Sequence, residues 1–495
     1  MSRTFSTENK NLPKLNDPKL FRQTAYVDGK WVPAESGAKF SVTDPSTEQE
    51  IGKVPEMNAE DIKTAAILAN EAFNDWSKQT AKRRHDLLKK WHALILENQN
   101  DLATILTLEN GKPLKEALGE IKYGASFIEW FAEEAVRVYG DVIPSPASNQ
   151  RLIVIKQPVG VVGLITPWNF PNAMITRKAG AALAAGCTVI VKPGAETPLS
   201  ALVLAELADR AGIPKGVFNV VTTHENVQQV GEELCTNPII KKISFTGSTA
   251  VGKLLMKQSA STLKKVTLEL GGNAPFIIFD DADIDAAVDG AIQSKFRASG
   301  QTCICANRIY VQSSILAEFA CRLAEKVGSF KLGNGLESDS THGPLINRKA
   351  VEKVKQHVED AVAKGAEIII GGIHRSGNFF EPTVLNGMTQ DMLISSEETF
   401  GPVAALYKFE TEEEVIGFAN ATSSGLAGYF YSGDVRRCWR LAEALEVGMV
   451  GINTGAISNC EAPFGGIKES GVGREGSKYG IEDYLNIKYI NFGGL

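Results

Sequence analysis

Cys303 is the residue of this chain whose type and position best fit a nucleophile. It follows Gly300, which permits a sharp turn, and lies where a helical segment, Ile284 to Ser299, gives way to a strand-like segment, Arg308 to Val311. A cysteine attacks a carbonyl carbon readily near neutral pH, because even a modest lowering of its pKa from about 8.5 yields appreciable thiolate. A single cysteine can equally be a small buried hydrophobic residue, so this interpretation needs support from elsewhere in the chain.

Two further residues of catalytic type lie at the ends of predicted strands. Asn169, in Thr166-Pro-Trp-Asn-Phe-Pro171, stands between two prolines and could present an amide donor from a stiff turn. Glu269, in Lys265-Val-Thr-Leu-Glu-Leu-Gly-Gly-Asn273, lies in an otherwise apolar strand, where burial should raise its pKa and suit it to general-base work. A turn-forming Asn and a buried Glu satisfied by backbone donors are the ordinary alternatives.

Two more strand ends fit a nucleotide. Lys192 closes a strand just before a helix that starts at Pro198, and it could hold a ribose hydroxyl or a phosphate. Gly247 allows a tight turn before a helix that begins at Ser248, whose N–H groups and positive dipole end could receive a pyrophosphate. The stretch is not a G-x-G-x-x-G motif, so a solvated lysine and a plain strand-turn-helix remain open.

The elements that must position these residues alternate between strand and helix, which predicts an α/β fold with a parallel sheet covered by helices and ligands at the strand ends. The expected elements are strands at 161–166, 188–192, 217–221 and 242–246 and helices at 173–185, 198–211 and from 248. A second α/β region is expected over 270–480, with strands at 367–370, 403–409 and 449–452. The long helical stretch 114–139 is expected to be scaffold. The strip 151–156 and the tail 484–492 are expected to pair across a subunit interface.

Composition excludes several classes of function. The 495 residues, with 43% hydrophobic and 22% charged residues, fit an ordinary globular protein of two or three domains. A net charge of −6 argues against nucleic-acid or anionic-membrane partners. Seven scattered cysteines suggest neither a disulfide framework nor a zinc site, so no metal is expected. The segment Met1 to Lys19 has no signal-like apolar core, so we expect a cytoplasmic protein without a membrane span.

Six motifs together resemble the aldehyde dehydrogenase superfamily over nearly the whole chain. They occur in that family's order: Pro167-Trp-Asn-Phe-Pro171, Phe245-Thr-Gly-Ser248, Leu268-Glu-Leu-Gly-Gly272, Gly300-Gln-Thr-Cys303, Glu398-Thr-Phe-Gly-Pro402 and Pro463-Phe-Gly-Gly466. The resemblance implies a Rossmann-type cofactor domain, an α/β catalytic domain and a small oligomerisation strand pair. The implied divisions are 1–139 with 159–269 for the cofactor domain, 270–480 for the catalytic domain, and 140–158 with 481–495 for oligomerisation.

The resemblance also implies roles for individual residues. Cys303 would be the nucleophile, Asn169 the oxyanion donor and Glu269 the base that activates water. Lys192 would hold the adenosine ribose, and Glu398 the nicotinamide ribose, of NADP or NAD. The implied cofactor-binding set is Trp168, Lys192, Pro193, Gly194, Ala195, Gly247, Ser248, Thr249, Ala250, Val251, Gly252 and Glu398.

The expected substrate is an aldehyde with a distal carboxylate. Arg177 and Arg297 flank the Asn169 and Cys303 motifs, and two guanidiniums near a thiol could grip a carboxylate, although either could be an ordinary surface or interdomain charge. With Ser458 they resemble the succinate-semialdehyde dehydrogenase branch. That branch implies oxidation of succinate semialdehyde to succinate in 4-aminobutyrate degradation. Alternatives are another carboxylated semialdehyde, such as glutarate semialdehyde, a cysteine-dependent esterase, or a non-catalytic dinucleotide-binding protein.

Three smaller expectations complete the analysis. In the family, a Glu at the position of Ala195 repels a 2′-phosphate; the methyl group here should admit NADP, although Glu196 leaves the preference open and NAD remains possible. Oxidation could join Cys303 to Cys305 as a switch, since a turn can bring two such Cα atoms within about 4.4–6.8 Å, or Cys305 could be inert. The family resemblance implies a homodimer or homotetramer.

Overall fold

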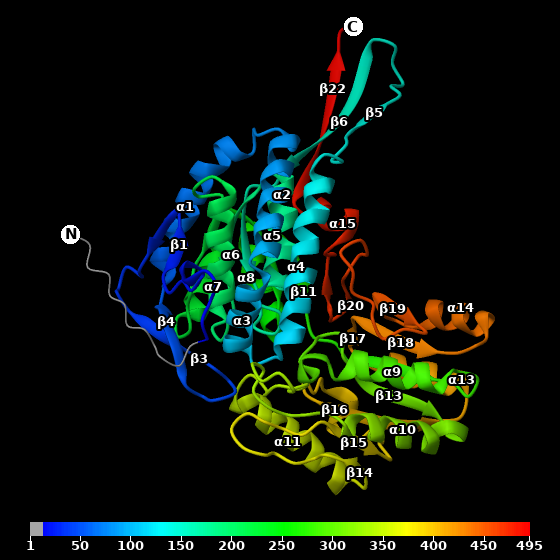
Figure 1. Ribbon diagram of the computed structural model, residues 1–495. Coiled ribbons are helices and arrows are strands. Elements are labelled where there is room, and N and C mark those ends of the chain that lie inside the picture. Colours follow the sequence, from blue (N-terminus) through cyan, green and yellow to red (C-terminus); the bar gives the residue numbers. More distant parts are fainter. Residues whose placement is uncertain (1–12) are drawn as a thin grey trace.

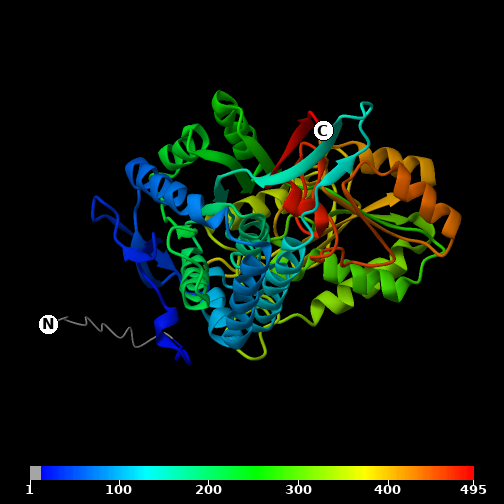
Figure 2. The same cartoon turned by 90° about the horizontal axis from the view of Figure 1, so that it is seen from above.

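The computed structural model describes residues 13–495, and its architecture consists of two large sheets, each covered by helices, with an extended three-stranded arm (Figure 1). Seen from above, the helices around the first sheet and those around the second form two separate groups (Figure 2). The start of the predicted cofactor domain, and most of the Met1 to Lys19 segment, lie outside the described residues.

The first sheet has eight strands in the order β2-β1-β9-β8-β7-β10-β11-β21. Its five central strands, β9, β8, β7, β10 and β11, run parallel to one another. The central strands read as apolar runs because both faces are covered, and every residue of β7 and β8 is buried. The strands are β1 (Ala25–Val27), β2 (Lys30–Val32), β7 (Val161–Ile165), β8 (Thr188–Lys192), β9 (Phe218–Val220), β10 (Ile240–Thr246), β11 (Lys265–Glu269) and β21 (Gly471–Val472).

Helices cover both faces of this sheet. One face carries α5 and α6, with α2, α3 and α4 packed outside them, and the other carries α1, α7 and α8. Asn58 caps α1 in a reciprocal box with Asp61, as its side-chain type predicts. The helices are α1 (Ala59–Trp76), α2 (Ala81–Glu97), α3 (Gln99–Asn110), α4 (Leu114–Ala135), α5 (Ala173–Ala185), α6 (Pro198–Ala211), α7 (Val227–Thr236) and α8 (Thr249–Ser259).

The second sheet has seven strands in the order β14-β15-β16-β13-β12-β18-β19, parallel except for the edge strand β14. Helices α9 and α10 cover one face, and α11, α13 and α14 cover the other. The elements are β12 (Ala274–Ile278), α9 (Ile284–Lys295), β13 (Ala306–Gln312), α10 (Leu316–Gly328), α11 (Arg348–Ala363), β14 (Glu367–Ile370), β15 (Thr383–Asn386), α12 (Leu393–Ser396), β16 (Val403–Phe409), α13 (Glu412–Asn420), β18 (Ala427–Tyr431), α14 (Val435–Ala444) and β19 (Met449–Ile452).

The remaining strands build small sheets. The arm consists of β5 (Asp141–Ile143), β6 (Gln150–Pro158) and β22 (Leu485–Gly493), which follows α15 (Ser477–Glu482). The expected pairing of the tail with the 151–156 strip is confirmed, but it forms within one chain and not across a subunit interface: β22 pairs antiparallel with β6, with Tyr489 opposite Val154. Two further pairs are β3 (Lys39–Thr43) with β4 (Glu50–Pro55), and β17 (Ser424–Gly425) with β20 (Ile467–Lys468).

The helix predicted to run to Ser299 ends four residues earlier, at Lys295. Ala298, Ser299 and Gly300 then adopt consecutive left-handed conformations, with φ values of 51°, 54° and 76°. Only Gly300 takes such a conformation without steric cost, so packing must hold the other two residues in place. Helical periodicity therefore overestimated this helix, because a tertiary contact competes with its last turn.

Candidate active site

Cys303 lies between this left-handed turn and β13. Gly300 cannot carry a side chain here, because a Cβ would come within 2.0 Å of the Gly401 carbonyl oxygen. The Ser299 hydroxyl donates to the Gly343 carbonyl oxygen at 2.8 Å, and the Gln301 side chain accepts a hydrogen bond from Ile346 N–H at 2.9 Å. These bonds fix the backbone on the N-terminal side of the thiol, which is itself half-buried. The expected placement of Cys303 on a rigid turn is confirmed.

The surroundings of this thiol keep it protonated. The pKa of Cys303 is raised to about 12, mainly by burial; Glu398 and Glu269 act in the same direction, whereas Arg177 lowers it. The thiol form, not the thiolate, therefore predominates near neutral pH in this state of the protein. Any attack by Cys303 on a carbonyl carbon must include transfer of the thiol proton to a nearby acceptor.

Asn169 points its side chain at the same loop. Its Nδ2 donates to the Gln301 carbonyl oxygen at 3.1 Å, two residues before Cys303, and its Oδ1 accepts from Phe170 N–H at 3.1 Å. The Asn169 carbonyl oxygen accepts a hydrogen bond from the Lys112 ammonium at 2.7 Å. An amide nitrogen carries two hydrogens, so one remains available to an oxyanion formed at the thiol.

Glu269, the last residue of β11, is buried, and neither of its carboxylate oxygens has a hydrogen-bond partner among residues 13–495. Burial raises the pKa of this carboxyl well above its usual range, and the neighbouring Glu475 raises it further; Arg177, Lys178 and Arg474 act in the opposite direction. A carboxyl group whose pKa is raised toward neutrality can accept a proton at physiological pH and release it again.

Arg177 is buried inside an ion-pair cluster rather than free. Its Nε lies 2.6 Å from Oε2 of Glu475, which also pairs with Lys178. Its guanidinium lies against the rings of Phe127 and Phe464, at 5.0 and 4.1 Å from their centroids. Its Nη2 has no hydrogen-bond partner within the described part of the chain. Because unpaired buried donors are costly, this nitrogen is suited to a ligand.

Arg297 and Ser458 are brought together, but Arg177 is not part of the same cavity. Arg297 and Ser458 line a small cavity of about 40 Å³ with Thr302, the residue before Cys303. The Arg297 guanidinium also lies 5.0 Å from the centroid of the Phe170 ring. The structure thus places one predicted carboxylate ligand beside the cavity next to the thiol and buries the other in a separate cluster.

The predicted cofactor residues meet at the carboxyl end of the first sheet. Ser248 caps α8, and the first turn of that helix is exposed, so its N–H groups are open to an anion. The loops after β7 and β8 meet at Gly194, where a Cβ would lie only 3.0 Å from the backbone nitrogen of Trp168. Lys192 ends β8, and burial lowers its pKa to about 8.

Glu398 closes this region from the second sheet. Its Oε1 accepts from Gly272 N–H at 3.3 Å, and a Cβ on Gly271 would come within 3.0 Å of its Oε2. Burial raises the pKa of Glu398 to about 7. The exposed N-terminus of α8, a lysine at a strand end and a carboxylate opposite them fit a dinucleotide, whose phosphates and ribose hydroxyls need donors and acceptors of these types.

One face of α4 belongs to the site, although the sequence indicated only scaffold. Glu116 accepts from Ala298 N–H at 2.9 Å, inside the left-handed turn. Glu120 accepts from Asn172 N–H at 2.9 Å and pairs with Lys112 at 2.5 Å. Tyr123 is hydrogen-bonded to Ser458, and its ring packs edge-on against Phe127. Two acidic residues at i, i+4 on the inward side of an apolar helix were the available signal.

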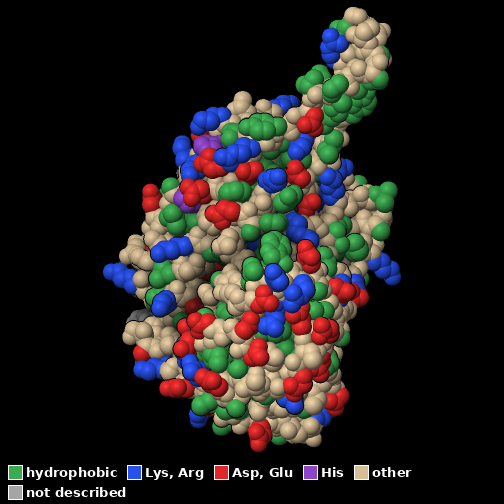
Figure 3. Space-filling view, turned by 90° about the vertical axis from the view of Figure 1, so that its right-hand side faces the viewer, with side chains coloured by type: hydrophobic (Ala, Val, Ile, Leu, Met, Phe, Trp, Pro, Cys, Tyr) green, Lys and Arg blue, Asp and Glu red, His purple; other side chains and the backbone are tan. Residues whose placement is uncertain are grey.

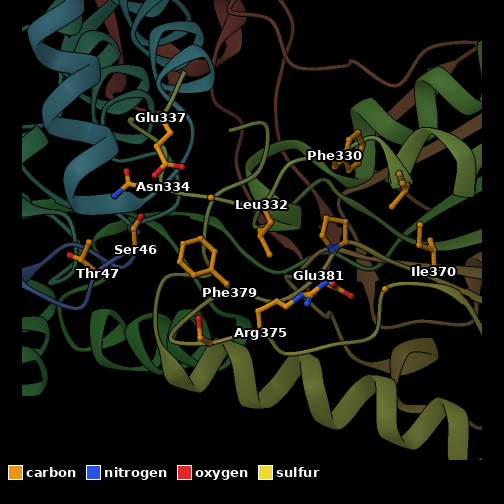
Figure 4. A pocket seen from close by; sticks show the side chains of 16 residues that line it. Ser46, Thr47, Phe330, Leu332, Asn334, Glu337, Ile370, Arg375, Phe379 and Glu381 are labelled. Carbon is orange, nitrogen blue, oxygen red and sulfur yellow. The ribbon is translucent and has the colours of Figure 1, made fainter. Parts of the chain in front are cut away.

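Cavity size does not locate this site. A cavity of about 740 Å³ lies between the β3–β4 turn, the end of α10 with the loop after it, and the loop after β14. Figure 4 shows Phe330, Leu332 and Phe379 on its walls, with Arg375 beside Glu381. None of the predicted catalytic, cofactor or substrate residues lines it. Among residues 13–495, no helix is long and apolar enough to cross a membrane. The same residues contain no cluster of His, Cys, Asp or Glu side chains that could hold a metal ion.

Comparison with known proteins agrees with this site. The chain is 57% identical to the NADP(+) succinate-semialdehyde dehydrogenase GabD of Escherichia coli (strain K12), over 97% of this chain and all of that protein. It is 58% identical to a glutarate-semialdehyde dehydrogenase of Pseudomonas aeruginosa, with similar coverage. A crystal structure of succinate-semialdehyde dehydrogenase from Burkholderia pseudomallei superposes with a TM-score of 0.96, at 56% identity, over 97% of this chain and all of that one.

The class of protein follows from the fold and these matches together: an oxidoreductase built on a dinucleotide-type sheet beside a second α/β sheet. The pattern of the aldehyde dehydrogenase family matches residues 31–490. The chain belongs to the aldehyde dehydrogenase family. The resemblance and the fold class expected from the six motifs are therefore confirmed.

Proposed function

We propose that this protein oxidises succinate semialdehyde to succinate and reduces NADP+ or NAD+, as a step of 4-aminobutyrate degradation. The observation that carries this proposal is the cavity beside the thiol, where Arg297 and Ser458 could bind an anion next to Thr302. Guanidinium and carboxylate pair through two parallel hydrogen bonds, so a short aldehyde bound by its carboxylate would present its other end to Cys303. The Escherichia coli relative supports the same substrate.

The chemistry assigns one step to each of three residues. Cys303 gives its thiol proton to solvent water and attacks the aldehyde carbon, and the second Nδ2 hydrogen of Asn169 stabilises the oxyanion of the resulting thiohemiacetal. NAD(P)+, when bound, supplies the acceptor for the hydride that leaves this carbon. Glu269 then takes a proton from water, which attacks the thioester; succinate leaves and the Cys303 thiol reforms. The overall reaction converts the aldehyde, water and NAD(P)+ into the acid, NAD(P)H and a proton.

The residues around the cofactor favour acceptance of NADP. The side chain of Ala195 is a methyl group that offers a 2′-phosphate neither repulsion nor a hydrogen bond, and Lys192 ends the adjacent strand. We assign the ribose and phosphate contacts to the residue set named from the motifs, Trp168 to Ala195, Gly247 to Gly252 and Glu398. Glu196, one residue after Ala195, carries a carboxylate that could repel a 2′-phosphate, so the proposal includes NAD as a second cofactor.

A glutarate-semialdehyde dehydrogenase is the second candidate. A relative of that name is as similar to this chain as the succinate-semialdehyde dehydrogenases are. The two substrates differ by one methylene, and a pocket separates such homologues by only about 1–3 kcal/mol.

One assay tests the proposal. Reduction of NADP+ and of NAD+ is measured with succinate semialdehyde, glutarate semialdehyde and propanal, for the wild type and for Arg297→Ala. We expect kcat/KM to be highest for succinate semialdehyde with NADP+. We also expect Arg297→Ala to lower it about tenfold or more, mainly through KM, because a hydrogen-bonded charge is lost, while propanal oxidation is unchanged. Equal rates for propanal and the two semialdehydes in the wild type would refute a carboxylate site.

The assembly and cellular location are also proposals. We infer cofactor and catalytic domains over 1–139 with 159–269 and over 270–480, and oligomerisation segments at 140–158 and 481–495. The arm projects from the body of the molecule with apolar side chains on its surface, which supports a homodimer or homotetramer (Figure 3). We also propose a cytoplasmic location, which localisation of a tagged protein by fractionation tests.

Cys303 and Cys305 remain candidates for a redox switch. Both thiols are free, Cys305 is buried, and its sulfur lies 3.5 Å from the Lys295 carbonyl oxygen. We infer that peroxide oxidises Cys303 to the sulfenic acid, which Cys305 then attacks to form a disulfide with loss of water. Mass spectrometry of the peroxide-treated enzyme tests this inference: a peptide that is two hydrogens lighter and recovers with dithiothreitol supports it, and a Cys305→Ser enzyme that recovers equally well contradicts it.

A further inference from the structure

We propose that Tyr123 on α4 is a specificity-determining residue whose hydroxyl donates a hydrogen bond to the anionic end of the aldehyde substrate. This inference rests on the proposed function. The helix carrying Tyr123 was expected to be scaffold, and none of the six motifs includes this residue.

The position of the Tyr123 hydroxyl carries the first step. It is hydrogen-bonded to the Ser458 hydroxyl, which lies 335 positions further along the chain in the loop after β19. Ser458 lines the cavity beside the thiol together with Arg297. The phenol oxygen of Tyr123 therefore contacts a residue of that cavity's wall from α4. Tyr123 is only half-buried, so this end of the side chain is not sealed inside the helix packing.

The ring of Tyr123 carries the second step. It packs edge-on against Phe127, one turn later on α4, with centroids 5.0 Å apart and an interplanar angle of 83°. The guanidinium of Arg177 lies 5.0 Å from the centroid of the same Phe127 ring. Tyr123 is thus fixed between Arg177, reached through Phe127, and Arg297, reached through Ser458.

Chemistry then selects the ligand. Without an anion, the two hydroxyls of Tyr123 and Ser458 satisfy each other. A carboxylate only accepts hydrogen bonds, so beside Arg297 it would receive both hydroxyl protons in place of that mutual bond. Hydrogen bonds to a charged acceptor are about twice as strong as those between neutral groups. A neutral aldehyde offers no such acceptor, so the exchange should favour anionic substrates alone.

Tyr123→Phe removes only the hydroxyl and tests the proposal. We expect KM for succinate semialdehyde to rise about tenfold with kcat within about twofold of the wild type, the effect of one hydrogen bond to a charged group. The inhibition constant of succinate, measured against propanal oxidation, should rise by the same factor, and propanal kinetics should not change. Tyr479→Phe, which removes an exposed tyrosine hydroxyl on α15, is the matched control and should behave as the wild type.

A double substitution separates direct contact from support of Ser458. If Tyr123 donates to the substrate itself, Tyr123→Phe with Ser458→Ala raises the succinate inhibition constant beyond Ser458→Ala alone. If the double variant equals Ser458→Ala alone, Tyr123 only holds Ser458 and the proposal is overturned. Equal losses with succinate semialdehyde and propanal also overturn it. A wild type that prefers no carboxylated aldehyde refutes the proposed function instead, so the two failures are distinguishable.

Discussion

At the scale of single residues, the site contains acidic groups whose burial disfavours the charged, deprotonated form. The Cys303 thiol and the Glu269 carboxyl both have raised pKa values, and burial is the largest cause in each case. The protein tolerates this because Arg177 supplies positive charge nearby and because Lys178 and Arg177 hold Glu475 in its charged form.

Replacement of the base separates the two halves of the reaction. With Glu269→Gln we expect one equivalent of reduced cofactor in a rapid burst and then a steady-state rate reduced about 10²–10⁴-fold, because acylation is complete while hydrolysis has lost its proton acceptor. Stopped-flow absorbance of the reduced cofactor measures both phases. A steady-state rate equal to that of the wild type would remove Glu269 from the mechanism.

The same carboxyl predicts the pH dependence. Only its deprotonated form accepts a proton, so the steady-state rate should fall as pH falls through a pKa well above the usual carboxyl range, and Glu269→Gln should abolish this limb.

The raised pKa of Glu269 also means that the folded state binds this proton more tightly than the unfolded chain. Its contribution to stability is therefore complete below the unfolded pKa and is lost as pH rises through the folded one. Initial rates and urea midpoints across pH measure the two effects.

At the scale of elements, α4 connects the two sheets at the site. Its residues reach the turn before Cys303, the start of α5 and the loop after β19. The Glu116 contact spans 182 positions of the chain and holds Ala298 in a left-handed conformation that costs on the order of 1–3 kcal/mol. A helix surface thus helps the neighbouring loops to set the geometry of the nucleophile's backbone.

Glu116 variants test this positioning. Glu116→Gln keeps an oxygen acceptor for Ala298 N–H and should retain near wild-type kcat. Glu116→Ala leaves that N–H without its partner and should lower kcat about tenfold for succinate semialdehyde and propanal alike, with a loss of about 1–3 kcal/mol in the free energy of unfolding. Steady-state kinetics and urea unfolding measure these values. A loss restricted to succinate semialdehyde would show instead that Glu116 acts through Arg297.

At the scale of the whole molecule, the arm is a sheet without a core of its own. Val142, Ile487, Tyr489 and Phe492 are 78%, 75%, 57% and 57% exposed. A three-stranded ribbon that packs nothing against these side chains is marginal in water, so a second copy of the chain is the expected cover.

Substitutions on one face of β22 test this. Alternation places Ile487 and Tyr489 on one face and Lys488 on the other. We expect Ile487→Lys with Tyr489→Lys to shift the protein to a smaller species, because charges replace apolar contacts. Lys488→Gln should leave the assembly unchanged. Analytical ultracentrifugation measures the mass, and an unchanged mass in the double variant would place the interface elsewhere.

Local patterns in the sequence predicted much of the fold. The bounds of α5, α6 and β8 agree with their predicted ranges, because unbroken apolar runs, Pro198 and the glycines after each helix act within a few residues. The motifs likewise placed Cys303, Asn169 and Glu269 at strand ends or turns. The strand that pairs with β22 was predicted correctly, but its position in the same chain was not, and the end of α9 was predicted wrongly; both errors concern contacts with distant segments.

The sequence by itself determined the family, the alternating elements and the residue types available for chemistry, because these depend on neighbours along the chain. Only the tertiary structure decided that Arg177 is paired with Glu475, that Arg297 shares a cavity with Ser458 and that Tyr123 reaches this cavity from α4. Burial and pairing arise from segments hundreds of positions apart, and one sequence carries no periodic signal for such contacts. The same holds for the raised pKa of Cys303, which follows from desolvation that folding alone imposes.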